Sequence, residues 1–141
     1  MRTTWNPFSN KTKLTFLLAL LFSTLMFSSP SYAEWTKMSE SVTGDTMYVD
    51  FERIKKHGGY VYWWDLMNNL KPTTTGILSV KAYHQGDCKV FRWKPLTGIF
   101  YKESMGEGTG DVLEPPPEHK VWKYPIPNSI DEVVLKAVCN H

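Results

Sequence analysis

The side chains that could carry out chemistry are few in this sequence, and their spacing defines no familiar site. The histidines are His57, His84, His119 and His141. They show no ligand spacing with one another or with cysteine, and a protein metal site needs three or four converging ligands. We therefore expect no bound metal. His84 lies in an alternating segment and is expected to be a packed or surface histidine.

Nucleophilic and acid–base catalysis also lack the partner groups that they require. A serine nucleophile needs a base and a group that orients this base, and no serine of the chain stands in such a motif. Glu114 and Glu118 lie in a proline-rich segment, with no visible apolar pocket that would raise a carboxyl pKa. The glycine-rich stretch 106–110 lacks the Lys-Ser/Thr pair of a phosphate-binding loop. We expect no catalytic residues, no cofactor and no enzyme activity.

Cys88 and Cys139 are the two residues whose chemistry the sequence does indicate. An even number of cysteines in an exported chain indicates a disulfide. With two cysteines, only one intramolecular pairing exists. The bond would close a loop of about 50 residues, which is worth roughly 4 kcal/mol in the chain-entropy model. The alternative is a pair of unrelated free thiols.

The N-terminus carries an export signal, which is what makes a disulfide plausible. Basic residues precede an apolar run over residues 14–27, and small residues follow up to Ala33. This order is that of a secretory signal peptide, which we expect to span residues 1–33 with cleavage before Glu34. The alternative is an uncleaved anchor, but the apolar run is shorter than the roughly 20 residues that a spanning helix needs.

The mature chain, residues 34–141, is long enough for one domain and too short for two. The sequence has 16 basic and 14 acidic residues. Three of the basic residues lie in the signal peptide, so 13 remain and the mature net charge is −1. A near-neutral domain has no electrostatic basis for binding nucleic acid or an anionic membrane. No cysteine lies near the cleavage site, so we expect no lipid anchor and a product in the periplasm or outside the cell.

Short segments rich in Val, Thr, Tyr, Phe and Trp, separated by turn residues, predict an antiparallel sheet. Strands are expected at residues 35–41, 46–51, 60–66, 77–85, 89–93, 96–102 and 121–124, with a further short pairing at 111–113. Residues 52–57 are ambiguous and are compatible with one helical turn. Pro95 suits an edge or a bulge.

The C-terminal segment is the one with helical spacing. Its apolar stripe comprises Ile130, Val133, Val134, Ala137 and Val138. Asn128 or Ser129 is expected to cap its N-terminus. A helix of three turns is marginal in water, so it must pack on the sheet, where Cys88 would hold its end. The predicted fold class is α+β, with about six antiparallel strands and one C-terminal helix across one face.

Aromatic residues are the feature that points to binding. In the segment 60–66 they occupy both faces, with Trp63 on one face and Tyr62 and Trp64 on the other. A strand that is apolar on both faces is covered on both sides or lies at a binding or dimer surface. Tyr62, Trp63 and Trp64 are therefore the candidate interface residues, and packing in the core is the alternative for each.

These features together resemble the surface-adhesin E-like domain of Gram-negative bacteria, along nearly the whole mature chain. The resembling motifs are Tyr48-Val49-Asp50, Val61-Tyr62-Trp63-Trp64, Cys88 after a polar turn, the Gly106-Glu107-Gly108 bend, and the ending from Pro127-Asn128-Ser129 to Val138-Cys139. The resemblance implies a six-stranded sheet, a C-terminal helix tethered to its concave face by the disulfide, and possible homodimerisation.

The best-known branch of this family is an adhesin that binds host matrix and plasma proteins such as vitronectin, laminin and plasminogen. The present chain differs from that branch because it has no lipid-anchoring cysteine. Its loop before Cys88 also carries one lysine, Lys71, and a run of threonines instead of a basic cluster. The resemblance implies a non-enzymatic binding module for a host protein. The alternative is a periplasmic structural or interaction protein with a partner in the bacterial envelope.

Overall fold

The computed structural model describes residues 33–141. The expected signal peptide lies outside these residues except for Ala33, so its assignment stays a prediction. No helix among the described residues has the length and apolarity needed to cross a membrane.

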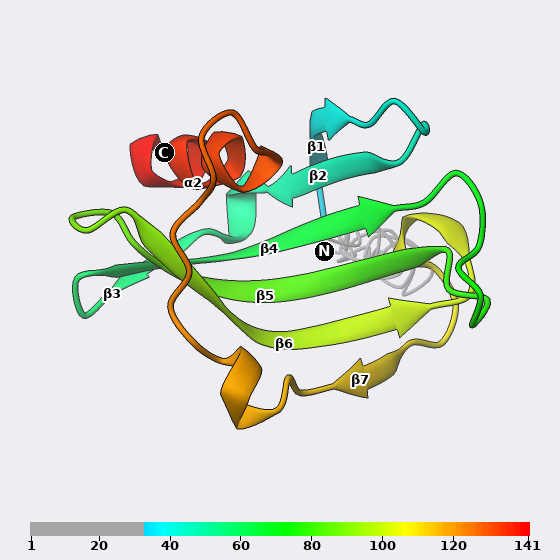
Figure 1. Ribbon diagram of the computed structural model, residues 1–141. Coiled ribbons are helices and arrows are strands. Elements are labelled where there is room, and N and C mark those ends of the chain that lie inside the picture. Colours follow the sequence, from blue (N-terminus) through cyan, green and yellow to red (C-terminus); the bar gives the residue numbers. More distant parts are fainter. Residues whose placement is uncertain (1–32) are drawn as a thin grey trace, which may run out of the picture. The chain divides into compact units, whose positions relative to one another are not determined.

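Seven antiparallel strands form one sheet in the described domain, in the order β1-β2-β4-β5-β6-β7, and β3 pairs with the start of β4 (Figure 1). The strands are β1 (Trp35–Glu40), β2 (Thr46–Asp50), β3 (Lys55–His57), β4 (Tyr60–Asn68), β5 (Ser79–Asp87), β6 (Arg92–Tyr101) and β7 (Asp111–Leu113). The helical elements are the 3-10 turns η2 (Phe51–Arg53), η3 (Ser104–Gly106) and η4 (Pro117–His119), and the helix α2 (Ile130–Asn140). The predicted α+β fold is confirmed, with seven strands in the sheet where about six were expected.

One strand, β3, was not predicted and comes from the ambiguous segment 52–57. Its first residues complete η2, and its last three form β3, which joins β4 through Gly58 and Gly59. Both glycines have positive φ angles, 59° and 82°, which glycine adopts at little cost. The pair therefore permits the tight turn that brings β3 back against β4.

Two other strand predictions need correction. Residues 89–93 and 96–102 do not form separate strands, because β6 runs continuously past Pro95 through a register shift opposite His84. Residues 121–124 do not form a strand. Within this segment a single bridge joins Lys123 to Trp93, because prolines on both sides of the segment limit further backbone pairing.

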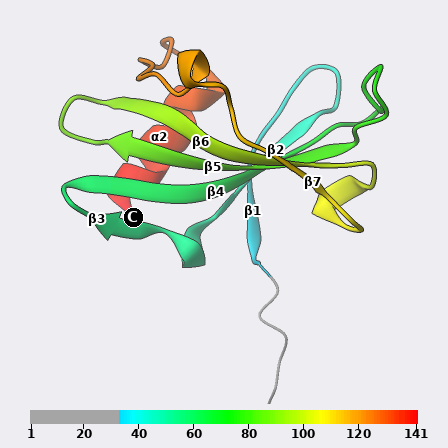
Figure 2. The ribbon, with the colours of Figure 1, turned by 90° about the horizontal axis from the view of Figure 1, so that it is seen from below.

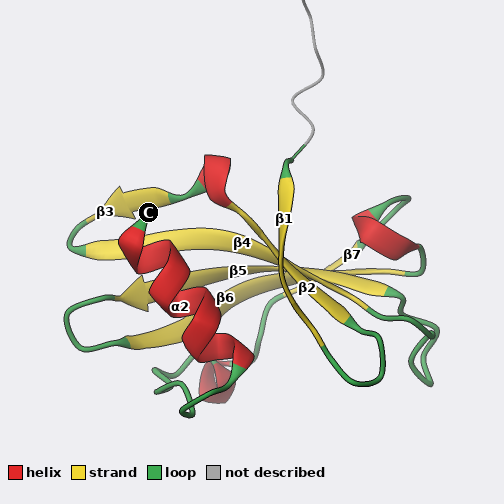
Figure 3. Ribbon diagram, turned by 90° about the horizontal axis from the view of Figure 1, so that it is seen from above, coloured by secondary structure: helices red, strands yellow, loops and turns green. Residues whose placement is uncertain are grey.

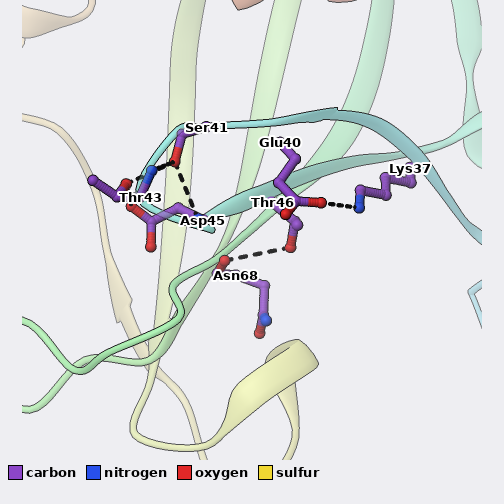
Figure 4. A network of polar contacts seen from close by, with 7 residues as sticks. All are labelled: Lys37, Glu40, Ser41, Thr43, Asp45, Thr46 and Asn68. Carbon is purple, nitrogen blue, oxygen red and sulfur yellow. Dashed lines mark hydrogen bonds and ion pairs between the residues drawn. The ribbon is translucent and has the colours of Figure 1, made fainter.

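The turn between β1 and β2 is held by a local polar network (Figure 4). The Ser41 hydroxyl accepts hydrogen bonds from the backbone N–H groups of Thr43, at 3.3 Å, and of Asp45, at 3.1 Å. The Asp45 carboxylate accepts from the Thr43 hydroxyl at 2.9 Å, and from the backbone N–H of Leu70 at 2.9 Å. The network therefore ties this turn to the loop that follows β4.

Helix α2 begins after Ser129, whose hydroxyl accepts a hydrogen bond from the backbone N–H of Glu132 at 3.3 Å. The expected N-cap is confirmed. The predicted apolar stripe needs one correction. Leu135 is fully buried, whereas Val133 is 44% exposed, because the helix contacts the sheet through the side that also carries Val134 and Val138.

The core lies between α2 and one face of the sheet, which we call the helix side (Figure 3). It contains Val49, Val61, Trp63, Val134, Leu135 and Val138. At Gly86 on β5, an added Cβ would lie 2.9 Å from the Trp63 side chain and 3.0 Å from that of Leu135. The missing side chain at this position is what allows the helix to lie so close to the sheet.

The disulfide between Cys88 and Cys139 is present and joins the turn after β5 to the end of α2. The described residues contain no free cysteine. The predicted tether between the helix and the sheet is therefore confirmed.

Candidate functional site

The alternation of side chains along β4 places the three candidate interface residues on two faces of the sheet. Trp63 is 2% exposed and belongs to the core beneath α2. This corrects the interface expectation for Trp63, because the helix covers the face on which its side chain lies. Tyr62 and Trp64 lie on the opposite face of β4 and are partly exposed. We call this face, seen in Figure 2 with α2 behind the strands, the open face.

Tyr83 on β5 joins Tyr62 and Trp64 into one aromatic group on the open face. Its ring stacks at 4.8 Å from the centre of the Trp64 ring and at 6.2 Å from that of Tyr62. The register pairs Trp64 directly with Tyr83, which explains the shorter distance. Burial and the neighbouring Tyr62 raise the pKa of the Tyr83 hydroxyl. We call these three residues the Tyr62 cluster.

A second aromatic contact extends the open face toward the start of β4 and β6. The ring of Trp122 stacks on Tyr60 at 5.6 Å. The side chains of Arg92 and Lys94 place their charges 4.6 and 4.8 Å from the centre of the Trp122 ring, within the range of cation–π attraction. Because Tyr60 and Tyr62 are two residues apart on one strand, their side chains are neighbours on the same face.

Residues 120–129, which we call the strap, bring Trp122 to this position. The strap connects η4 to α2 and passes beside β6 on its way to the helix (Figure 1). Two backbone hydrogen bonds between Trp93 and Lys123, at 2.9 and 2.7 Å, hold it beside β6. Lys123 is thereby aligned with Trp93, and the preceding residue, Trp122, contacts the open face.

The open face also carries basic side chains beside its aromatic rings. A hollow of about 330 Å³ is lined by Trp64 and Tyr83 together with one acidic residue, Glu52, and two basic ones, Arg53 and Lys55. Arg53 is paired with Asp50 at 3.2 Å. In the described part of the chain, the ammonium groups of Lys55 and Lys94 form no ion pair. The arrangement suits contact with aromatic or apolar groups that have carboxylates nearby.

The open face ends where η3 packs over the sheet. Lys81 donates a hydrogen bond to the carbonyl of Gly106 at 2.8 Å, and its ammonium lies 4.8 Å from the centre of the Tyr101 ring. Burial and the charge of Arg53 lower the pKa of the Lys81 ammonium. The Ser79 hydroxyl donates to the carbonyl of Glu103 at 2.6 Å. These contacts cover part of the sheet here. Beyond them, on β1 and β2, Trp35 and Tyr48 are also partly exposed.

The other sequence candidates lie apart from the open face. His84 is on the helix side, 7% exposed, with its Nε2 2.9 Å from a carboxylate oxygen of Asp65. Glu114 is paired with Lys120 at 2.8 Å, and this contact lowers the pKa of the Glu114 carboxyl, opposite to what a general acid needs. Among residues 33–141, no three His, Cys, Asp or Glu side chains converge as metal ligands.

Sequence reasoning missed Tyr83 and Trp122 as members of the open face. The position of Tyr83 was accessible, because it has the opposite parity to the alternating apolar residues of its strand and therefore faces away from them. The position of Trp122 depends on the course of the strap, and no local pattern in the sequence reports that course.

The fold is similar to that of protein E from Haemophilus influenzae. Crystal form II of that protein matches with 17% identity and a TM-score of 0.58, over 79% of this chain and 91% of that chain. The selenomethionine form matches with 18% identity and a TM-score of 0.57, over 79% and 90% of the two chains. The structure from a non-typeable strain matches with 16% identity and a TM-score of 0.53, over 79% of each. At these identities the likeness establishes a shared fold.

The sequence itself matches the family model described as surface-adhesin protein E over residues 35–140. No curated protein matches the chain. The family match spans β1 to the end of α2, and so includes both cysteines and every residue of the open face named above. The chain therefore belongs to the surface-adhesin protein E family.

Proposed function

We propose that this protein is an exported, non-enzymatic adhesin that binds a host protein through the open face. Membership of a surface-adhesin family supports the general role. The position of the binding site on the open face is supported by the Tyr62 cluster. Its three stacked aromatic side chains lie on a face that α2 does not cover.

The composition of the open face is that of a protein-binding surface. Tyrosine, tryptophan and arginine dominate the binding energy of protein interfaces, where they form a compact centre surrounded by polar residues. Here Trp64 and Tyr83 would form the centre, and Lys55 and Lys94 would form part of the rim. The stacking within the cluster restricts these side chains before binding, which lowers the entropy lost on association.

The basic rim favours a partner surface with carboxylates next to apolar side chains. Lys55 pairs in register with Tyr62 across β3 and β4, and Lys94 pairs with Gln85 across β6 and β5. Lys55 therefore lies on the strand next to Tyr62, and Lys94 lies on the strand next to Tyr83. Charges at an interface rim mainly raise the association rate, and their effect weakens with salt.

A binding assay with matched variants tests this proposal. The exported product of the full chain would be titrated onto immobilised laminin, vitronectin and plasminogen, the ligands that the family resemblance suggests. We expect saturable binding to at least one of them, and a loss of about 30-fold or more in affinity for Trp64→Ala, the effect of removing an interface hot spot.

Met67→Ala is the control for this assay. Met67 is also on β4 and is 41% exposed, but its side chain lies on the helix side. We expect its affinity to equal that of the wild type. Absence of saturable binding to all three proteins, or an equal loss for both variants, would contradict the proposal.

Surface location is a separate part of the proposal and needs its own test. The full chain would be expressed in Gram-negative cells, and intact cells would be treated with a protease. We expect the protein to be digested while a periplasmic marker enzyme stays intact. Complete protection until the outer membrane is opened would favour the alternative role, in which the protein acts in the periplasm on an envelope partner.

A further inference from the structure

Helix α2 lies over one end of the strands on the helix side and leaves their other end uncovered (Figure 3). Two hollows lie on this side. One, of about 290 Å³, lies between α2 and the strands β4 and β5, and the other, of about 440 Å³, lies over β5, β6 and β7. Both hollows are lined by Val80 and Ala82, so they adjoin across β5. We call the two together the trough, whose apolar lining includes Met47, Met67, Val80, Ala82, Phe100 and Leu113.

The size and lining of the trough fit a long aliphatic ligand. It extends from β4 to β7, three interstrand spacings of about 4.8 Å, or about 14 Å, which is the length of an extended chain of about ten carbons. The larger hollow alone is within the range of about 300–1,000 Å³ that is usual for small-ligand sites. The methionine side chains of Met47 and Met67 are flexible and can adapt to the shape of an apolar ligand.

Most polar side chains of the trough are already paired with one another. Nε2 of His84 lies 2.9 Å from a carboxylate oxygen of Asp65, and Glu114 is paired with Lys120 at 2.8 Å. An extended peptide would bring backbone N–H and C=O groups into a trough that offers them few partners, and burial of unpaired backbone groups is costly. An alkyl chain has no such groups, so the lining favours an alkyl chain over a peptide.

The charges at the α2 end of the trough disfavour a charged ligand group of either sign. Asp131 lines this end but is exposed to solvent, and together with Asp65 it would repel an anion. Nζ of Lys123 already lies 5.4 Å from the centre of the Trp93 ring, so a ligand cation on this ring would compete with Lys123. The ligand group that complements this end is therefore uncharged.

Two indole N–H groups indicate what the uncharged group contains. Trp63 and Trp93 both line the hollow beside α2, and their ring centres lie 5.2 and 5.0 Å from that of His84. In the described residues, Nε1 of each indole is buried without a hydrogen-bond partner, as is Nδ1 of His84. An indole N–H can only donate, and buried donors are nearly always paired in folded proteins. These groups therefore require an acceptor, such as a carbonyl oxygen.

We propose that the trough binds a neutral lipid whose aliphatic chain ends in an ester carbonyl. The chain lies across Ala82 toward Phe100 and Leu113, and the carbonyl oxygen accepts a hydrogen bond from the indole N–H of Trp63 or Trp93. This placement removes the alkyl chain from water and satisfies a buried donor. The trough is on the opposite side of the sheet from the Tyr62 cluster, so this site is independent of the proposed function.

Calorimetric titration of the exported protein with methyl hexanoate, methyl octanoate and methyl decanoate tests the proposal. We expect each added methylene to tighten binding about 3- to 4-fold, the effect of removing one methylene from water. Octanoate and n-octylammonium, which carry a charge in place of the ester, should bind at least 5-fold more weakly than methyl octanoate. Binding of either ion as tight as that of methyl octanoate, or an affinity independent of chain length, would overturn the proposal.

NMR of the same protein locates the bound ester. We expect methyl octanoate to shift the methyl signals of Met47 and Met67, and to move the indole N–H signal of Trp63 or Trp93 downfield as the hydrogen bond forms. The signals of Trp122, on the open face, and of Met105, in η3, should stay in place. Unchanged signals of the two trough methionines, or of both trough indoles, would contradict the proposed placement.

A pair of variants tests whether the two hollows act as one site. Ala82→Phe places a ring where the hollows meet, and we expect it to weaken methyl octanoate binding by 10-fold or more. Val112→Phe is the matched control, because Val112 is 66% exposed on β7 and lines neither hollow. Unchanged affinity in a folded Ala82→Phe protein would overturn the proposal. So would a dimer that buries Met47 and Met67 and excludes the ester, because a second copy would then cover the trough.

Discussion

Trp63 and Trp64 are neighbours in β4, yet their side chains have different surroundings. Trp63 lies beneath α2 with 2% of its surface exposed, whereas Trp64 stacks on Tyr83 on a face with no helix over it. The helix side and the open face are built from the same strands and contain similar side chains. What separates them is the element that lies on top, and this element is fixed by Gly86 and by the disulfide.

The comparison shows that aromatic content alone does not identify a binding surface in a small sheet protein. On the helix side, aromatic side chains fill the thin core that one short helix can cover. On the open face, they stack on one another and on cations, and they remain accessible. A residue contributes to stability or to binding according to its parity along the strand, so substitutions at adjacent positions should separate the two roles.

The largest expected contrast is between Trp63→Ala and Trp64→Ala. We expect Trp63→Ala to lower the free energy of unfolding by about 3–5 kcal/mol, the usual loss for a large aromatic side chain in a core. Trp64→Ala should lower the free energy of unfolding by less than half as much, because the Trp64 side chain is partly exposed in the wild type. Urea denaturation measures both values, and equal losses would mean that the two faces are not distinct.

Removal of the disulfide tests what keeps the helix side covered. The cysteines are separated by 51 positions, and in the chain-entropy model a loop of this size is worth about 4 kcal/mol. We expect Cys88→Ala combined with Cys139→Ala to lower Tm by roughly 15 °C or more for a domain of this size. A Tm equal to that of the wild type would show that packing alone holds α2 on the sheet.

A smaller effect is expected from Gly86→Ala. The new methyl group would press on Trp63 and Leu135 in the core, and overpacking of this kind costs about 1–3 kcal/mol of unfolding free energy. Gly98→Ala is the matched control, because its nearest contact is one edge of the Phe100 ring at 3.1 Å. An unchanged stability for Gly86→Ala would argue against the close approach of α2 at this position.

The smallest expected effect concerns pH and the turn between β1 and β2. A backbone hydrogen bond from Leu70, and one from the Thr43 hydroxyl, hold the pKa of the Asp45 carboxyl below its ordinary value. The folded state therefore binds this proton less readily than the unfolded state. The resulting stabilisation is present above the ordinary pKa of 3.8 and is lost as the pH falls through the lower folded value.

Thermal melting across acidic pH measures this contribution. We expect the Tm of the wild type to fall more steeply between neutral pH and pH values below 3.8 than that of Asp45→Asn, whose amide does not titrate. The difference should be small, because Asp45 is at the surface. Parallel profiles for the two proteins would show that the network in Figure 4 does not depend on the charge of Asp45.

Local patterns predicted much of the fold. The aromatic run in β4, the alternation in β5 and the helical spacing after Ser129 are local patterns, whereas the two cysteines indicate a contact between distant residues. The corresponding elements and the disulfide are present. The pairing of β3 was not predicted, because three exposed residues carry no hydrophobic pattern. Residues 121–124 have the composition of a strand but form part of the strap. Strand pairing also requires a free sheet edge of matching length, and here only one bridge forms, between Lys123 and Trp93 of β6.

The candidate sites were less accessible to sequence reasoning. Tyr62 and Trp64 could be placed on one face by parity, whereas the assignment of Trp63 required knowledge of which face the helix covers. The cavity next to α2 brings together Asp65, His84 and Asp131 from three elements. These three residues are far apart in the sequence and form no motif. They lie close together because the helix packs on the sheet.

Side-chain footprinting of a complex measures most directly whether the two faces have separate roles. The protein would be exposed to hydroxyl radicals with and without laminin, or whichever of the three host proteins it binds, and oxidation would be read by mass spectrometry. We expect the partner to lower the oxidation of Tyr62, Trp64 and Tyr83 and to leave that of Met67 unchanged. Protection of Met67 with undiminished oxidation of Trp64 and Tyr83 would contradict it.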